Sequence, residues 1–370
     1  MTIAKGKSDR VFLFVTLLLI AVGFFVFMSA SLGLVAREGA NFMTVILKQA
    51  GIALIGIIAM IVASNIDVKR YRKVAPLIFL AALGLTALVF APYVGFTHGG
   101  ATRWLTLGSY TFQPSEFLKI ASVIFLAALL SGRKENLVQS ARGFIPFFLI
   151  AGSVAALMLK QPDTGTFIVI FFALLAIYIT SGAKFKHIAI ILLCCVIGIA
   201  SLAYFRPYVA ERFKTFFDPT SDIQGSGYQM QQALIAVGSG GVTGRGFGQS
   251  IQKFNYLPEP IGDSIFAVAA EEFGFVGAVS IIIIFIFFAL RGLKIAASSK
   301  DAFGRLLAIG IITLITAQAL INIGAIIGVM PLTGIPLSFV SHGGTALIFT
   351  MIEAGMILNI SRKSSVRQKS

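Results

Sequence analysis

The sequence predicts an all-α integral membrane protein, and its composition and apolar segments support this fold class. The 370 residues are 57% hydrophobic and only 12% charged, whereas soluble domains carry about 25% charged residues. A segment of about 20 apolar residues can cross a bilayer as a helix, because a helix satisfies its own backbone hydrogen bonds. The composition therefore excludes an ordinary water-soluble enzyme.

Ten transmembrane helices are predicted from windows of about 19 residues. They lie near residues 11–35, 45–65, 73–92, 115–131, 143–160, 166–182, 187–205, 264–290, 304–329 and 344–361. The first apolar run follows basic residues, as in a signal peptide, but it is too long for one and lacks a small-residue cleavage site. We therefore expect a retained first span and a single polytopic domain over residues 1–370.

The basic residues predict the orientation of this bundle. Lys and Arg outnumber Asp and Glu by 30 to 15, which gives a formal net charge of +15. Most of them fall on one side of the predicted spans, in groups at 5–10, 69–73, 133–142, 184–186, 291–305 and 362–369. Basic loops stay in the cytoplasm and face anionic membrane lipids. Both termini are therefore expected in the cytoplasm, with a basic tail over 362–370, and the charge needs no nucleic acid partner.

Three polar stretches are expected on the opposite side, near residues 93–115, 206–263 and 330–343. The longest, 206–263, is rich in Gly, Gln and aromatic residues and forms a large extracytoplasmic loop between predicted helices 7 and 8. Loops of this length are often functional. Within it, Tyr228–Ala236 predicts an amphipathic helix lying on the membrane. No inverted repeat is visible, which counts against many secondary transporters.

Several candidate site residues lie at the outer ends of the early spans. Glu116 and Lys119 are three residues apart, so a helix places them on one face, and Arg103 lies in the loop just before them. Asp163 lies between two spans in a stretch broken by Pro and Gly. It either caps the following helix or serves the site, and both roles can coexist.

Asp263 is the last acidic residue before the eighth predicted span. Its carboxylate either caps that helix or faces an outward cavity, where it accepts a proton. Arg245 and Lys253 precede it in a glycine-rich stretch, Gly244–Ser250 and beyond. The glycine spacing does not indicate a dinucleotide site, because no strand precedes it and no βαβ unit surrounds it.

The predicted outer side thus combines four cations with three carboxylates. Cations neutralise a phosphate-bearing leaving group, and a carboxylate activates a hydroxyl nucleophile. This set suits glycosyl transfer from a lipid pyrophosphate, and it suits equally a transporter that binds the head group without reacting. The sequence identifies no metal ligands, although charge neutralisation makes Mg²⁺ or Mn²⁺ a candidate cofactor.

Motifs along most of the chain carry a resemblance to a known family. They are Gly100–Leu105, Phe112–Lys119, Gln161–Thr166, Gly227–Gln229, Gly244–Ser250, Leu257–Glu259, Ile265–Ala267, Asn322–Gly324, Pro331–Leu337 and Ser341–Gly344. With these motifs in this order, the chain resembles the SEDS family of cell-shape, elongation, division and sporulation proteins, typified by RodA, FtsW and SpoVE. The Gly244–Ser250 stretch more closely resembles the FtsW/SpoVE branch.

The resemblance implies a ten-helix enzyme of the bacterial cytoplasmic membrane that polymerises lipid II into glycan strands, by inverting transfer from an undecaprenyl-pyrophosphate donor. Asp263 matches the family's essential carboxylate and is the expected general base. Arg103, Glu116 and Lys119 match its polar cluster and are expected to bind substrate, as are Asp163 and the cations Arg245 and Lys253. The expected partners are lipid II, membrane lipids and a class B penicillin-binding protein, which is a transpeptidase.

Two alternatives stay open at this point, a lipid II flippase and a non-catalytic scaffold. The chain also departs from the family pattern near the predicted base, where Ile261 and Gly262 replace a common His-Thr pair. Ser338, His342 and Thr345 replace a common Pro, Tyr and Ser. These changes affect the expected substrate geometry but leave the carboxylate of Asp263 in place.

Overall fold

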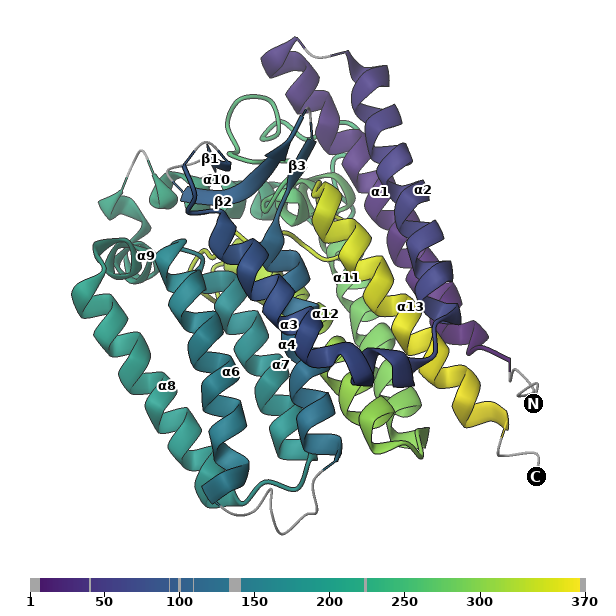
Figure 1. Ribbon diagram of the computed structural model, residues 1–370. Coiled ribbons are helices and arrows are strands. Elements are labelled where there is room, and N and C mark those ends of the chain that lie inside the picture. Colours follow the sequence, from purple (N-terminus) through teal and green to yellow (C-terminus); the bar gives the residue numbers. More distant parts are fainter. Residues whose placement is uncertain are drawn as a thin grey trace.

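The computed structural model is a bundle of long helices capped at one end by a small sheet and irregular loops (Figure 1). It describes residues 7–39, 41–92, 94–98, 101–108, 110–132, 141–222 and 225–366. Eight helices are long and apolar enough to cross a membrane: α1 (Arg10–Glu38), α2 (Phe42–Asn65), α3 (Val68–Leu88), α4 (Pro114–Ser131), α8 (Phe185–Phe205), α11 (Ile265–Ser298), α12 (Ala302–Ile326) and α13 (Gly344–Val366). The protein is therefore a multi-pass membrane protein.

Two further helices have shorter apolar stretches: α6 (Ala141–Lys160), which is apolar over Phe144–Lys160, and α7 (Thr164–Thr180). Each of the ten predicted spans falls on one of these ten helices, and eight of the ten meet the length and hydropathy expected for a full span. The start of α3 differs from the prediction, because Asp67 accepts a hydrogen bond from Lys69 N at 2.8 Å and caps the helix at Val68. The predicted tail over 362–370 begins inside α13, and residues 367–370 lie outside the described residues.

The centre of the bundle is formed by α4, α12 and α13, whose most apolar 18-residue windows are each 72% buried, whereas the window of α8 is 6% buried. Near-continuous apolar sequence lets the central helices contact neighbours on all sides, while α8 lies at the edge of the bundle (Figure 1). The start of α1 lies beside the end of α13, because Asp9 N donates to Ser361 Oγ at 3.0 Å.

A three-stranded antiparallel sheet lies at the other end of the bundle, where the sequence predicted only a polar loop. Its strands are β1 (Gly95–His98), β2 (Ala101–Leu107) and β3 (Tyr110–Phe112), in the order β1-β2-β3. Ala101 and Leu105 are buried, four residues apart on one face of β2. Most of the described chain is helical as predicted, but the all-α fold class did not include this sheet, which places Arg103 beside the ends of α6 and α7.

The predicted loop over 206–263 contains helices of its own. They are α9 (Pro207–Phe217), the short 3-10 helix η1 (Pro219–Ser221) and α10 (Ser226–Ser239). The structure confirms a helix over Tyr228–Ala236. Helix α10 packs against α11, and its Met230, Ala233 and Ala236 are buried. These helices lie at the sheet end of the bundle (Figure 1).

A kink at Gly274 lets the glycine-rich loop enter the hydrogen-bond ladder of α11. Gly274 has φ 64° and ψ −163°, a conformation that L side chains rarely adopt. The amide groups of Phe275 and Val276 therefore donate to the carbonyls of residues 241 and 242. In exchange, the carbonyls of Glu271 and Glu272 accept from the amides of residues 245 and 246. The glycines here serve close backbone packing, in agreement with the rejection of a dinucleotide site.

Candidate functional site

Asp263 lies at the sheet end of the bundle, two residues before α11 begins. Gln229 of α10 donates from Nε2 to Asp263 Oδ1 at 3.1 Å and to Ser264 Oγ at 3.0 Å. The Ser264 hydroxyl also lies 3.4 Å from Asp263 Oδ1. The side chain of Asp263 is half-buried. Its carboxylate is thus oriented by an amide and a hydroxyl, with no cation in direct contact among the described residues.

The surroundings of Asp263 make it a better base than an ordinary aspartate. The pKa of its carboxyl is raised to about 6, mainly because the group is buried and also because of the nearby charge of Glu259, although the hydrogen bonds from Gln229 and Ser264 act to lower it. A general base works best when its pKa lies near the working pH. The geometry therefore supports proton abstraction by Asp263.

This pKa predicts an acid limb in the rate of the reaction. A base must be ionised to act, so kcat/KM is expected to fall about tenfold per pH unit below about 6. Initial rates between about pH 4.5 and 8 would measure the limb, with circular dichroism at each pH to verify that the protein stays folded. A midpoint near the ordinary aspartate value would contradict the burial effect.

Arg212 of α9 lies opposite Asp263, and the sequence reasoning missed it. Its Nη1 donates to the carbonyl of Thr333 at 3.0 Å. A Cβ added at Gly334 would lie 3.7 Å from Asp263 Oδ2 and 3.9 Å from Arg212 Nη2. A glycine thus separates the carboxylate from the guanidinium. The available signal was an amphipathic pattern over residues 207–217, which carries aromatic and basic residues inside the long loop.

Arg103 and Asp163 lie near Arg212. The Arg103 guanidinium donates to the carbonyls of Gln161, at 3.3 Å, and Pro162. The charged groups that act on Arg212 include Arg103, Asp163 and Asp263. We call Arg103, Asp163, Tyr208, Arg212 and Asp263 the outer polar cluster.

Several buried polar atoms around this cluster have no hydrogen-bond partner among the described residues, and three of them concern the site most directly. These three are Asp163 Oδ2, Tyr208 OH and Thr333 Oγ1. The other oxygen of Asp163 accepts from Thr166 N at 3.2 Å and caps α7, which confirms the predicted capping role, while the predicted role in the site stays a prediction. Buried polar groups are normally satisfied by protein, water or ligand. The orphaned atoms therefore suit a polar ligand bound at this cluster.

Glu116 and Lys119 form a buried ion pair inside the bundle. Lys119 Nζ lies 2.8 Å from Glu116 Oε2 and donates to Gln318 Oε1 of α12 at 2.6 Å. Glu353 of α13, which the sequence reasoning did not single out, is also buried and interacts with both charges. Since this pair is 2% to 4% exposed, its predicted contact with substrate stays a prediction.

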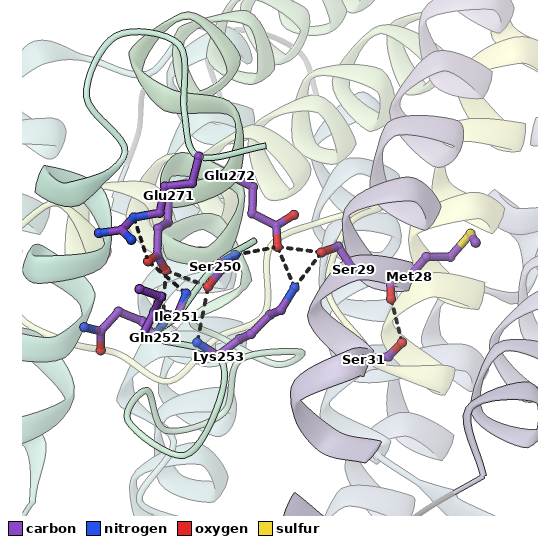
Figure 2. Close-up of polar contacts among 10 residues, drawn as sticks. Met28, Ser29, Ser31, Ser250, Ile251, Gln252, Lys253, Glu271 and Glu272 are labelled. Carbon is purple, nitrogen blue, oxygen red and sulfur yellow. Dashed lines mark hydrogen bonds and ion pairs between the residues drawn. The ribbon is translucent and has the colours of Figure 1, made fainter. Parts of the chain in front are cut away.

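Arg245 and Lys253 contact none of the residues of the outer polar cluster in the described contacts and instead pair with Glu271 and Glu272 in a second network. Figure 2 shows Lys253 with both glutamates. Lys253 Nζ lies 2.7 Å from Glu272 Oε1 and 2.9 Å from Ser29 Oγ of α1. Both charged side chains are 0% exposed. Arg245 Nε pairs with Glu271 Oε1 at 3.4 Å. The substrate-binding role of these two cations stays a prediction, and the contacts favour a role in holding the loop.

The carboxylates of Glu271 and Glu272 organise the loop from the kinked part of α11 (Figure 2). Glu271 accepts from Ser250 Oγ at 2.6 Å, Ile251 N at 3.0 Å and Gln252 N at 3.2 Å. Glu272 accepts from Ser29 Oγ and Lys253 Nζ. This network therefore joins the loop to α1 and α11.

The described residues include no group of three or more His, Cys, Asp and Glu side chains able to hold a metal ion. Asp163 and Asp263 are the carboxylates of the outer polar cluster, and hard divalent cations need six or more oxygen ligands, many of which come from water or phosphate. The predicted divalent cation stays a prediction.

Comparison with known proteins decides the family. A family model for FtsW, RodA and SpoVE proteins, described as "Cell cycle protein", matches residues 9–366. The chain belongs to this family. Stage V sporulation protein E of Bacillus subtilis is 37% identical over 98% of the chain and 100% of that protein. A probable peptidoglycan glycosyltransferase FtsW from Geobacter sp. (strain M18) is 35% identical over 96% of the chain and 97% of that protein.

Solved structures of family members show the same fold. A chain in a structure described as "Structural coordination of polymerization and crosslinking by a peptidoglycan synthase complex" matches with a TM-score of 0.81 and 26% identity, over 96% of this chain and 98% of that one. The rod shape determining protein RodA of Thermus thermophilus matches with a TM-score of 0.71 and 25% identity, over 96% and 97%. These findings confirm the predicted family resemblance, including its FtsW/SpoVE branch.

Proposed function

We propose that the protein is a peptidoglycan glycosyltransferase that polymerises lipid II into glycan strands, in wall synthesis for cell division or cell shape. The observation that carries this proposal is the placement of Asp263 and Arg212 on either side of Gly334, near Arg103 and Asp163. A base and two fixed cations within one cluster are the groups that transfer from a lipid pyrophosphate requires. Relatives named as peptidoglycan glycosyltransferases support this function over a flippase.

In the proposed reaction, Asp263 removes the proton from the 4-hydroxyl group of one lipid-linked disaccharide. The resulting oxygen nucleophile attacks the anomeric carbon of a second sugar from the face opposite the leaving group, which inverts that carbon. The bond from the anomeric carbon to the phosphate oxygen breaks, and undecaprenyl pyrophosphate leaves with the electron pair. Arg103 and Arg212 stabilise the charge on this leaving group through hydrogen bonds to its phosphates.

The buried Asp163 Oδ2 gives the outer polar cluster one additional hard oxygen donor. With the phosphate oxygens of the substrate, it would hold Mg²⁺ or Mn²⁺, which supplies further charge neutralisation when bound. The protein groups themselves bind the substrate, orient the hydroxyl and take up its proton.

We also propose that the ten apolar helices all span the bacterial cytoplasmic membrane, with both termini in the cytoplasm and the outer polar cluster on the extracytoplasmic face. The basic groups at 69–73, 184–186 and 291–305 lie at the ends of helices away from the sheet, as the positive-inside rule expects. A class B penicillin-binding protein is the proposed partner, in line with the peptidoglycan synthase complex among the structural relatives.

Purified protein and fluorescent lipid II test the function directly. The expected result is a ladder of glycan strands with release of undecaprenyl pyrophosphate, made with and without a class B penicillin-binding protein. The Asp263→Asn variant, purified in the same way, is the control for contaminating polymerases. The flippase alternative replaces the polymerase if the protein gives no strands under either condition but moves lipid II across the membrane of sealed vesicles. Such movement is detected because head groups inside the vesicles are protected from a reagent added outside.

Arg212→Ala is expected to lower kcat/KM about 100-fold, because a buried charge-assisted contact to phosphate contributes roughly 2 to 3 kcal/mol. Arg212→Lys should recover part of the loss, since it keeps the charge but not the planar fork. Lys214→Ala is the matched control, because Lys214 is an exposed cation on the same helix. Equal effects of Arg212→Ala and Lys214→Ala would exclude a specific contact.

A further inference from the structure

The segment between α12 and α13 has no regular secondary structure where it passes the outer polar cluster, yet side chains hold its backbone closely. The carbonyl of Thr333 accepts from Arg212, that of Ile335 from Asn322 at 2.8 Å, and that of Pro336 from Gln318 at 2.9 Å. Three donors therefore fix three carbonyls within four residues. We call residues 333–336 the site segment.

Asn322 joins the site segment to the predicted base. Its Nδ2 donates one hydrogen to the carbonyl of Ile335 and the other to the main-chain carbonyl of Asp263, at 2.7 Å. The side chain is 2% exposed. A primary amide has two N–H donors, and both are used here. One side chain of α12 thus holds the start of α11 and the site segment at a fixed separation.

Gln318 lies one helical turn before Asn322, on the same face of α12. Its Oε1 accepts from Lys119, at 2.6 Å, while its Nε2 donates to the carbonyl of Pro336. Lysine is a donor only, so it fixes the orientation of the amide and directs the NH₂ group to the site segment. The Glu116–Lys119 ion pair therefore acts on the site segment through Gln318.

We propose that Asn322 and Gln318 are positioning residues that set the Asp263 carboxylate against Arg212, with the Glu116–Lys119 pair acting through Gln318. The proposal rests on the proposed polymerase function. Arg212 donates a hydrogen bond to the carbonyl of Thr333, and Asn322 donates to the carbonyls of both Asp263 and Ile335. Both Arg212 and Asp263 are therefore held in position relative to the site segment. Displacement of a catalytic group by about 1 Å can lower the rate about 100-fold. Loss of either positioning residue should therefore slow the chemical step more than it weakens substrate binding.

Asn322→Leu tests the proposal, because leucine keeps the size of the side chain and removes both donors. We expect kcat to fall by about 10-fold to 100-fold, with KM within about twofold. Asn359→Leu is the matched control: Asn359 is also buried, also donates from Nδ2 to a main-chain carbonyl (Ser64, 2.7 Å), and lies on α13 away from the outer polar cluster. Its kcat should stay near the wild-type value.

Gln318→Met provides a second variant, which removes one donor to the site segment and leaves Asn322 intact. We expect a smaller loss of kcat than in Asn322→Leu. In the double variant Gln318→Met with Lys119→Met, the increase in activation free energy should be less than the sum of the increases in the two single variants. Unfolding midpoints in detergent separate these effects from general destabilisation. A wild-type kcat in both Asn322→Leu and Gln318→Met, or a loss confined to KM, would overturn the proposal. An inactive wild-type protein would instead refute the polymerase function.

Discussion

Replacing Asp263 with asparagine is expected to lower the rate of lipid II polymerisation by about 100-fold to 10,000-fold, the range contributed by a general base. Asparagine has the same shape and can still accept from Gln229, but it cannot take up a proton. The loss should appear in kcat at saturating lipid II, with a product ladder as the readout. The acid limb near pH 6 should disappear together with the activity.

Glu211→Gln is the control for this substitution, because it also neutralises one acid near the outer polar cluster, on the exposed side of α9. It should retain wild-type turnover. Lipid II binding by the Asp263→Asn variant should also remain close to wild type, since the arginines that bind phosphate are unchanged. If Asp263→Asn polymerised lipid II at the wild-type rate, the general-base role would be lost.

The second large effect concerns stability. Lys253→Met is expected to destabilise the protein by about 3 to 5 kcal/mol, the cost of leaving a buried carboxylate unpaired. Lys253 and Glu272 are 0% exposed, and the ammonium group also donates to Ser29 of α1. Thermal unfolding of the purified protein in detergent would measure the loss.

The double variant Lys253→Met with Glu272→Gln separates a structural role from substrate binding. It removes both charges, so most of the lost stability should return. Lys294→Met, an exposed cation on the same helix as Glu272, is the control and should leave the unfolding midpoint unchanged. A Lys253→Met protein of normal stability with a raised KM would instead support the predicted contact with substrate.

The sequence alone predicted the helices well because each has a strong and local signal. Apolar runs located every long helix, and Asp or Asn at the caps explains where several begin, as Asp67 does for α3 and Asp301 for α12. The sheet was missed because its strands are short and depend on each other: Phe96 faces Trp104, and Leu105 faces Phe112. Pairing of this kind is tertiary information that no single window contains.

The site was only partly predictable for the same reason. Asp263, Arg103 and Asp163 could be identified as outward charges next to helix ends, and the structure brings them together. Arg212 was missed because α9 was not distinguished from the rest of the long loop. Lys253 was grouped with the site by its side of the membrane, whereas its partner Glu272 lies in a helix 19 residues later in the chain.

The kink of α11 at Gly274 has a consequence for how the protein folds. The carbonyls and amides on both sides of the kink are satisfied by residues 241–246 instead of by the helix itself. In the low dielectric of a bilayer, unpaired backbone groups cost several kcal/mol each. The hydrogen bonding of α11 is therefore complete only when the preceding loop is in place, so we expect formation of this helix to be coupled to the assembly of the sheet end of the bundle.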